Sequence, residues 1–136
     1  DIGVAVAIDE GLITPVVRGA NLKGFLEISA EIKSLAAKAK AKKLQPYEYT
    51  GATFSISNLG IFGIKEVTAI INPPEAGILA VGGAQPTPVV RDGEVTVRNI
   101  MNVTMSCDHR VIDGATGAKF LQTFKQMLES PGAMAM

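Results

Sequence analysis

The segment VTMSCDHRVIDGATGAKFL, residues 103–121, combines a strand, a loop and a helix, and it carries the only histidine of the chain, His109. Its alternating apolar residues predict a strand over 100–107. Apolar residues at spacings of three and four predict a helix over 114–129, with Asp113 as its N-cap. The predicted apolar face of this helix comprises Ala118, Leu121, Phe124 and Leu128. His109 therefore lies between a strand end and a helix start, where side chains often line a cleft.

A second helix is predicted over residues 25–43. Its apolar face comprises Ile28, Ile32, Leu35, Ala36 and Ala39. Glutamates come early in this helix and lysines late, a polarity that suits the helix dipole. The lysine-rich end, KAKAKK at 38–43, has two interpretations, a basic docking patch or a solvated helix end. We favour the solvated end, because charge runs of this kind are usually solvated faces.

The remaining regular structure is predicted to be strands. Apolar, β-branched or alternating runs cover residues 2–8, 11–17, 53–60, 66–72, 76–83 and, as a hairpin turning at Asp92–Gly93, 86–99. The first two runs are close enough to pair as a hairpin, with Pro15 at an edge or bulge. The predicted fold class is therefore α/β, an α+β two-layer sandwich with a largely antiparallel or mixed sheet and flanking helices.

Composition excludes several classes of protein. The chain has 136 residues, with thirteen basic and thirteen acidic side chains that cancel. This balance argues against non-specific nucleic-acid binding as the main task. One cysteine excludes an internal disulfide framework and a cysteine-rich zinc site. We expect no metal site, because no cluster of ligand residues suggests one.

The ends of the chain and its apolar runs bear on its origin. No apolar run approaches the roughly 20 residues that span a membrane, and no signal or transit peptide is recognisable. The chain starts at Asp1, without a methionine, and leads directly into a predicted strand. We therefore expect an internal fragment of a longer protein, from which any targeting signal has been cut away.

The local sequence leaves the role of His109 open. Histidine takes and returns protons near neutral pH, and such a base needs an orienting partner. Asp113, four residues later, is placed to hold the imidazole, the loop or the helix start. Spacing alone favours a structural role for both residues. Cys107 alternates with apolar strand residues, so we expect a buried structural thiol.

Neither Ser57 nor the paired glycines show a local functional signal. Ser57 is predicted to share a strand face with Ser55 and Leu59, and nothing nearby singles it out. The glycines in NLGIFG and AVGGA do not fit the spacing of a nucleotide-binding loop. They are better explained by turns or by close backbone packing.

A longer pattern changes this assessment. The string DHRVIDGA resembles the signature of the dihydrolipoamide acyltransferases, the core components of the 2-oxo acid dehydrogenase complexes. The strings GLITPVV, GATFSISNLGIFGIKEVTAIINPPEAGILAVG and VTMSCDHRVIDGATGAKFL resemble that family in the family's own order. The part NLGIFGIKEVTAIINPP is most similar to the acetyltransferases of pyruvate dehydrogenase complexes. The resemblance covers almost the whole chain.

The resemblance implies a fold and a set of site residues. The fold is that of chloramphenicol acetyltransferase, assembled as a trimer with the active site between subunits. His109 matches the family's general base, Asp113 matches the supporting aspartate, and Ser57 matches the hydroxyl that stabilises the tetrahedral intermediate. The implied reaction moves an acetyl group between a dihydrolipoyl thiol and coenzyme A, without a metal.

The resemblance also implies partners and a domain context. The trimers would build a larger cage that binds the dehydrogenase and dihydrolipoamide dehydrogenase components, in the bacterial cytoplasm or the mitochondrial matrix. Residues 1–136 would form the C-terminal portion of one catalytic domain, whose N-terminal part is missing. The lipoyl and subunit-binding domains would be absent, and the lipoyl group would be carried on that absent lipoyl domain.

Three other functions stay open from the sequence. One is the transfer of a succinyl or branched-chain acyl group, although those relatives usually carry other residues after the NLG turn. Another is a non-catalytic structural core or binding subunit, against which the presence of His109, Asp113 and Ser57 argues. The last is a free-standing antibiotic acetyltransferase, which the SNLG…INPPEAGILAVG run fits less well.

Overall fold

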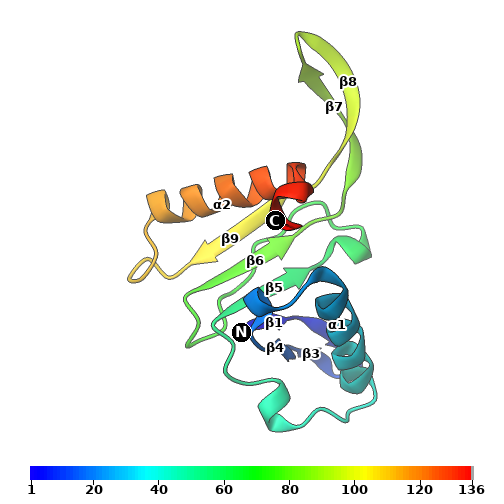
Figure 1. The fold of residues 1–136 in the computed structure, drawn as a ribbon, viewed down its shortest axis with the longest axis vertical. Helices are drawn as coiled ribbons and strands as arrows, with labels where there is room; N and C mark the ends of the chain where they lie inside the picture. Colours follow the sequence, from blue (N-terminus) through cyan, green and yellow to red (C-terminus); the bar gives the residue numbers. More distant parts are fainter. Residues whose placement is uncertain (136) are drawn as a thin grey trace.

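A five-stranded mixed sheet forms the centre of the fold. The structure is a computed structural model that describes residues 1–135. In sheet order, the strands are β4 (Val16–Val17), β1 (Ile2–Val4), β5 (Phe54–Asn58), β6 (Gly77–Val81) and β9 (Val103–Cys107). The inner strands β1, β5 and β6 are parallel, and both edge strands are antiparallel to their neighbours. The mixed sheet and the α/β class are thus as predicted (Figure 1).

The predicted N-terminal hairpin exists, but it is divided between two sheets. β1 pairs with β4 in the central sheet, whereas β2 (Val6–Ile8) pairs with β3 (Gly11–Ile13) in a separate two-stranded sheet. Pro15 lies between β3 and β4, outside any strand and fully buried. Its carbonyl accepts a hydrogen bond of 2.9 Å from the N–H of Val4. Proline is tolerated here because no ladder bond needs its missing N–H.

Helix α1 (Phe25–Lys40) packs against β2 and β4. The apolar face predicted for it is the face that is turned inward, and Leu35 and Ala39 are buried. The helix ends three residues before the predicted residue 43. It ends there because Lys42 adopts a left-handed conformation with φ of 59°, while the N–H of Lys43 returns to the carbonyl of Lys38 over 2.8 Å. This reversal uses carbonyls that a helix end leaves without partners.

The strand predicted over 66–72 is absent. In the described part of the chain, this segment pairs with no strand and has no regular secondary structure. It is attached to β9 by the Ser106 hydroxyl, which donates to the carbonyl of Ala69 over 2.6 Å, while Ile70 is 91% exposed. The prediction was wrong because β-branched composition gives only a propensity, and a strand also needs a partner.

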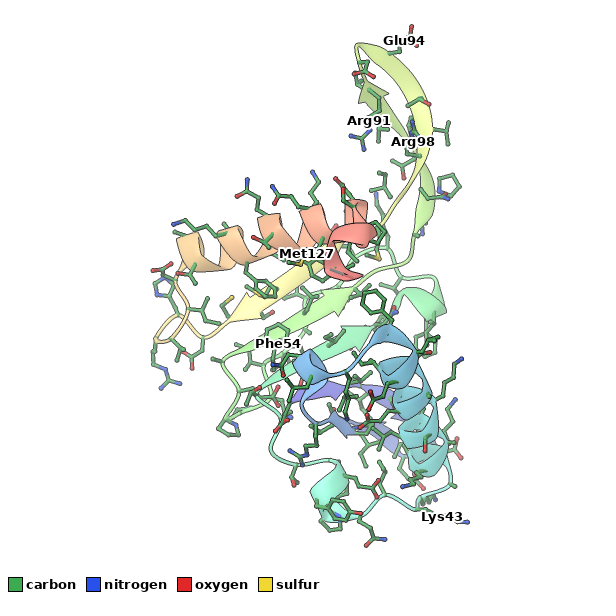
Figure 2. The ribbon with its side chains drawn as sticks, viewed as in Figure 1. Lys43, Phe54, Arg91, Glu94, Arg98 and Met127 are labelled. Atoms are coloured by element: carbon green, nitrogen blue, oxygen red, sulfur yellow. The ribbon has the colours of Figure 1, made fainter. Side chains whose placement is uncertain are left out.

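The second predicted hairpin forms an arm that stands away from the body of the molecule (Figure 1). It consists of β7 (Gln85–Arg91) and β8 (Glu94–Ile100). Asp92 and Gly93 form its turn with positive φ values of 50° and 80°, as their Asp-Gly sequence predicts. Figure 2 shows charged side chains along the arm, among them Arg91, Glu94 and Arg98.

Helix α2 (Gly114–Glu129) has the predicted bounds and packs on β9. Gly117 is the buried residue of α2. It lies so close to β9 that a side chain there would meet Met105 and Cys107. The predicted apolar face is only partly covered. Leu121 is half-buried, whereas Leu128 is 44% exposed. Both helices therefore lie against the sheet, at opposite ends of its strand order.

Four short 3₁₀ turns complete the described regular structure. They are Ala20–Leu22, Pro46–Glu48, Gly60–Phe62 and Pro131–Ala135. The second lies in the linker between α1 and β5. None of the helices within 1–135 combines the length and the apolar character needed to cross a bilayer.

The paired glycines mark a close crossing of main chains beside the C-terminal end of β6. A Cβ atom on Gly60 would lie 2.7 Å from the Cα of Gly83, and one on Gly82 would lie 1.9 Å from the Lys65 carbonyl oxygen. The prediction of close backbone packing is thus confirmed. Only residues without a side chain allow these segments to approach so closely.

We predict that Gly82→Ala destabilises the full chain by at least about 1–3 kcal/mol, the usual cost of overpacking, because a backbone carbonyl cannot easily move away. The matched control is Gly114→Ala, at the first position of α2, where an added Cβ meets no atom within 4 Å. It should leave stability within about 1 kcal/mol of the wild type. Denaturant unfolding measures both variants, and equal stability would contradict the predicted crossing.

Candidate active site

His109 is presented by a short, tightly hydrogen-bonded turn between β9 and α2. The N–H groups of Val111 and Ile112 both donate to the carbonyl of Asp108, over 2.9 and 2.8 Å. The N–H of Asp108 donates in turn to the carbonyl of Ala76, over 2.8 Å. The imidazole therefore stands on an exposed turn whose first residue is attached to the start of β6.

Asp108 also binds Arg110 across this turn. Its Oδ1 accepts from the backbone N–H and the Nε of Arg110, each over 3.0 Å, and its Oδ2 accepts from Nη2 over 2.7 Å. These bonds to the Arg110 guanidinium lower the pKa of Asp108 to about 2. The pair is exposed, with 89% of the Arg110 side chain accessible. Its contribution is therefore mainly to hold the geometry of the turn rather than to add much stability.

Asp113 caps helix α2, as the sequence predicted. Its carboxylate accepts the N–H of Thr116 over 2.7 Å. That backbone hydrogen bond holds the pKa of Asp113 below its ordinary value. Of the roles left open for Asp113, the structure shows the helix start. Asp113 thus fixes the far end of the turn that carries His109.

Two cavities flank His109. A cavity of about 780 Å³ is shared with the segment before β6 and with the turn itself. A cavity of about 360 Å³ lies toward α2, where Asp113 and Gly117 join its lining. Cys107 lines both cavities and is half-buried, so the expectation of a buried thiol is wrong. Since it directly precedes the turn, the strand end where it lies is open on two sides.

Ser57 lies in a different place. It is buried in β5 and lines a third cavity, of about 440 Å³, together with Leu12, Lys40 and Phe62 among others. No lining residue is common to this cavity and either cavity beside His109. One chain therefore brings His109 and Asp113 together and leaves Ser57 apart.

Strand register explains this separation. Ser57 lies opposite Ala80, near the C-terminal end of β6, whereas Cys107 lies opposite Gly77 at its N-terminal end. Three residues along a strand correspond to about 10 Å. In addition, β5 and β9 lie on opposite sides of β6. The strand residue Ser57 and the turn that carries His109 therefore point to opposite ends of the sheet.

Sequence reasoning missed a buried polar cluster beside His109. The Glu75 carboxylate, in a residue only 8% exposed, accepts the hydroxyl of Ser55 over 2.5 Å and the side-chain amide of Asn72 over 3.3 Å. Glu75 also lines the larger cavity beside His109. The available signal was a glutamate two residues before an entirely apolar strand, since a charge there needs partners.

Within 1–135, no three His, Cys, Asp or Glu side chains lie close enough together to hold a metal ion.

Known proteins share this architecture. Over residues 1–136, the chain matches the family described as 2-oxoacid dehydrogenases acyltransferase (catalytic domain). The acetyltransferase component of the pyruvate dehydrogenase complex of Rickettsia felis is 53% identical over 98% of this chain and 32% of its own length. The mitochondrial component of Dictyostelium discoideum is 51% identical over 96% of this chain and 21% of its own length. The chain thus spans about a third or less of these relatives.

Solved structures agree in fold. The dihydrolipoamide acetyltransferase of Azotobacter vinelandii, in which a serine, a histidine and an asparagine were investigated for roles in catalysis, superimposes with a TM-score of 0.94 at 39% identity. A cubic core of a pyruvate dehydrogenase multienzyme complex superimposes with the same score at 40% identity. Each match covers 99% of this chain and 56% of the other. The chain belongs to the 2-oxoacid dehydrogenase acyltransferase family and matches its catalytic domain.

Proposed function

We propose that this chain is part of a dihydrolipoamide acetyltransferase, which moves an acetyl group between a dihydrolipoyl thiol and coenzyme A in a pyruvate dehydrogenase complex. The observation that carries the proposal is the presentation of His109 on a fixed turn between two cavities. Two cavities at one base suit a reaction in which one thiol substrate passes an acetyl group to another. Relatives at about half identity are acetyltransferase components, which favours an acetyl group over a succinyl or branched-chain group.

In the proposed reaction, His109 acts as the general base. Its neutral imidazole removes the proton of the attacking thiol while that sulfur bonds to the thioester carbonyl carbon. The carbonyl electrons move to oxygen, and the hydroxyl of Ser57 donates a hydrogen bond to this oxyanion. When the intermediate collapses, the bond to the other sulfur breaks, and that thiolate takes the proton back from His109. Neither a metal nor an acyl-enzyme is needed.

Asp113 has a supporting role in this proposal. It keeps the end of the turn in place through the cap on α2. In the Azotobacter protein, the investigated asparagine comes four residues after the investigated histidine, the same spacing as from His109 to Asp113. Both side chains provide an oxygen that accepts a helix N–H, so either one serves as a cap.

We further propose that the complete site forms between two copies of the chain in a homotrimer. The separate cavities of Ser57 and His109 support this arrangement, because a second copy is then required to bring the hydroxyl to the base. Trimers would assemble into a larger cage, as the cubic core of the similar complex suggests. The dehydrogenase and dihydrolipoamide dehydrogenase components would be its partners.

The proposed setting follows from the same relatives. Residues 1–136 would form the C-terminal portion of one catalytic domain, and the lipoyl group would arrive on another domain of the complex. Coenzyme A is a substrate in this proposal. Relatives in bacteria and in a mitochondrion make the bacterial cytoplasm or the mitochondrial matrix the proposed location.

We predict that His109→Ala lowers acetyl transfer from acetyl-coenzyme A to dihydrolipoamide by at least about a hundredfold, the usual contribution of a general base. The assay uses a protein that contains the complete catalytic domain, and Lys119→Ala, at an exposed position on α2, is the control that keeps its rate. Succinyl-coenzyme A replaces the donor in a parallel assay. No transfer by a well-folded wild type would refute the proposed function, and faster succinyl transfer would change the acyl group.

The shared site has its own test. Ser57→Ala should lower kcat by about a hundredfold or more, since one oxyanion donor contributes on the order of 3 kcal/mol, whereas the exposed Ser34→Ala should not. Chains carrying His109→Ala and chains carrying Ser57→Ala are then unfolded together and reassembled. If each site takes His109 from one copy and Ser57 from the next, random mixing restores about a quarter of the wild-type sites. No recovery in mixed oligomers would place both groups in one chain.

The Asp108–Arg110 ion pair should make the stability of the protein depend on pH. Hydrogen bonds from Arg110 lower the pKa of Asp108 from 3.8 to about 2 in the folded protein. The ion pair therefore stabilises the fold at pH values above the pKa that Asp108 has in the unfolded chain. This contribution is lost as the pH falls through the pKa of Asp108 in the folded protein. Asp108→Asn should therefore destabilise the protein slightly above about pH 5, and the difference should shrink toward about pH 2. Denaturant unfolding across this range measures it. A difference that grows on acidification would contradict the assignment.

A further inference from the structure

Glu75 is a buried carboxylate that the proposed reaction does not use. It is 8% exposed and lies two residues before the apolar strand β6. Removing a carboxylate from water is costly unless hydrogen bonds replace the lost hydration. Here each oxygen has one side-chain donor, the Ser55 hydroxyl on one and the Asn72 amide on the other. A buried charge of this kind is weak evidence for stability, which raises the question of what else the carboxylate does.

The hydrogen bonds of Glu75 and of the next residue, Ala76, connect this segment with β5 and with the turn that carries His109. Its side chain reaches Ser55 in β5, and its backbone N–H closes the turn by donating to the Asn72 carbonyl over 3.0 Å. The next residue, Ala76, accepts the N–H of Asp108 over 2.8 Å. A continuous path of hydrogen bonds and one peptide unit therefore runs from β5 through Glu75 to the residue before His109.

The β5 end of this path has little freedom to move. A Cβ atom on Gly3 would lie 2.8 Å from the Ser55 hydroxyl and 2.7 Å from the Thr14 methyl group, so Ser55 occupies a space that only glycine leaves open. Ser55 itself is 2% exposed. The carboxylate is thus attached to a rigid part of the sheet rather than to a loop.

The other end of the path opens on the cavity beside His109. Pro73, Pro74 and Glu75 line this cavity of about 780 Å³ on one side, and Asp108, His109 and Arg110 line it on the other. On its exposed side, the turn is held by the Asp108–Arg110 pair. On its inner side, it is held by the hydrogen bond from the Asp108 N–H to the Ala76 carbonyl. Loss of the interior attachment would let the cavity wall and the turn separate.

We propose that Glu75 is a positioning residue for His109, and that it sets the Ala76 carbonyl to which the catalytic turn is attached. The proposal rests on the acetyl-transfer function proposed above. Misplacement of a reacting group by about 1 Å costs up to about a hundredfold in rate, so a small shift of this attachment is enough to matter. Glu75 acts through the turn, and contact with either thiol is not needed.

The experiment compares Glu75→Ala, Glu75→Gln and Ser55→Ala in the full chain, with the exposed Glu66→Ala of the same connecting segment as control. Glu75→Ala should lower kcat for acetyl transfer by about ten- to a hundredfold and change KM little. Glu75→Gln keeps an oxygen that accepts the Ser55 hydroxyl, and it should recover most of the rate. Ser55→Ala should lower kcat in the same direction, and the two losses should not add.

Hydrogen–deuterium exchange provides a readout that needs no substrate. In Glu75→Ala, the amide of Asp108 should exchange faster, because its acceptor on Ala76 has shifted, while α2 keeps its wild-type protection. General loss of structure would instead speed exchange in the sheet and in α2 together. The exchange result therefore separates positioning of the turn from a simple loss of folding.

Three results would overturn the proposal. They are wild-type kcat in a folded Glu75→Ala protein, exchange that rises equally in α2 and at Asp108, and a Glu75→Gln protein as slow as the alanine variant. If Glu75→Ala does not fold, Glu75→Gln and Ser55→Ala decide the question by the same two measurements. A wild type that transfers no acetyl group refutes the proposed function instead, and exchange at Asp108 still tests the attachment.

Discussion

The pairing of β6 with β5 on one side and β9 on the other is the constraint on which the rest of the structure depends. β6 is apolar and almost wholly buried, and both of its edges are used by neighbouring strands, as is usual at the centre of a sheet. Through β5 it sets the place of Ser57, and through β9 it sets the place of the turn that carries His109. Because these residues match opposite ends of β6, one chain keeps Ser57 apart from His109.

The turn itself shows how an exposed group is given a fixed position. His109 has no strand or helix of its own, and loops in general are more mobile than the elements that they connect. Here the loop is short, Asp113 joins it to α2, and Asp108 joins it to both Arg110 and Ala76. Each attachment uses a backbone group or a carboxylate close to the histidine in sequence. The imidazole is thereby exposed while its backbone is held on both sides.

The predictions from sequence were accurate where local rules decide structure. Helix α2 and the Asp92–Gly93 hairpin have the expected positions, because periodicity, an N-cap and a turn that needs positive φ are local properties. The prediction of a strand over 66–72 was wrong, because strand pairing depends on distant segments and this segment meets no partner strand in residues 1–135. The buried cluster around Glu75 was missed for the same reason, since Ser55 is 20 residues away in sequence.

The sequence by itself determined the fold class, both helices and the identity of the candidate groups, since the signature around His109 and the run through Ser57 are readable as strings. Only the tertiary structure decided which of these groups meet. It separated Ser57 from His109, and it attached the segment of Glu75, through the Ala76 carbonyl, to the turn that carries His109. The physical reason is that strand register and burial depend on contacts between distant segments, and these contacts form only when the chain packs around β6.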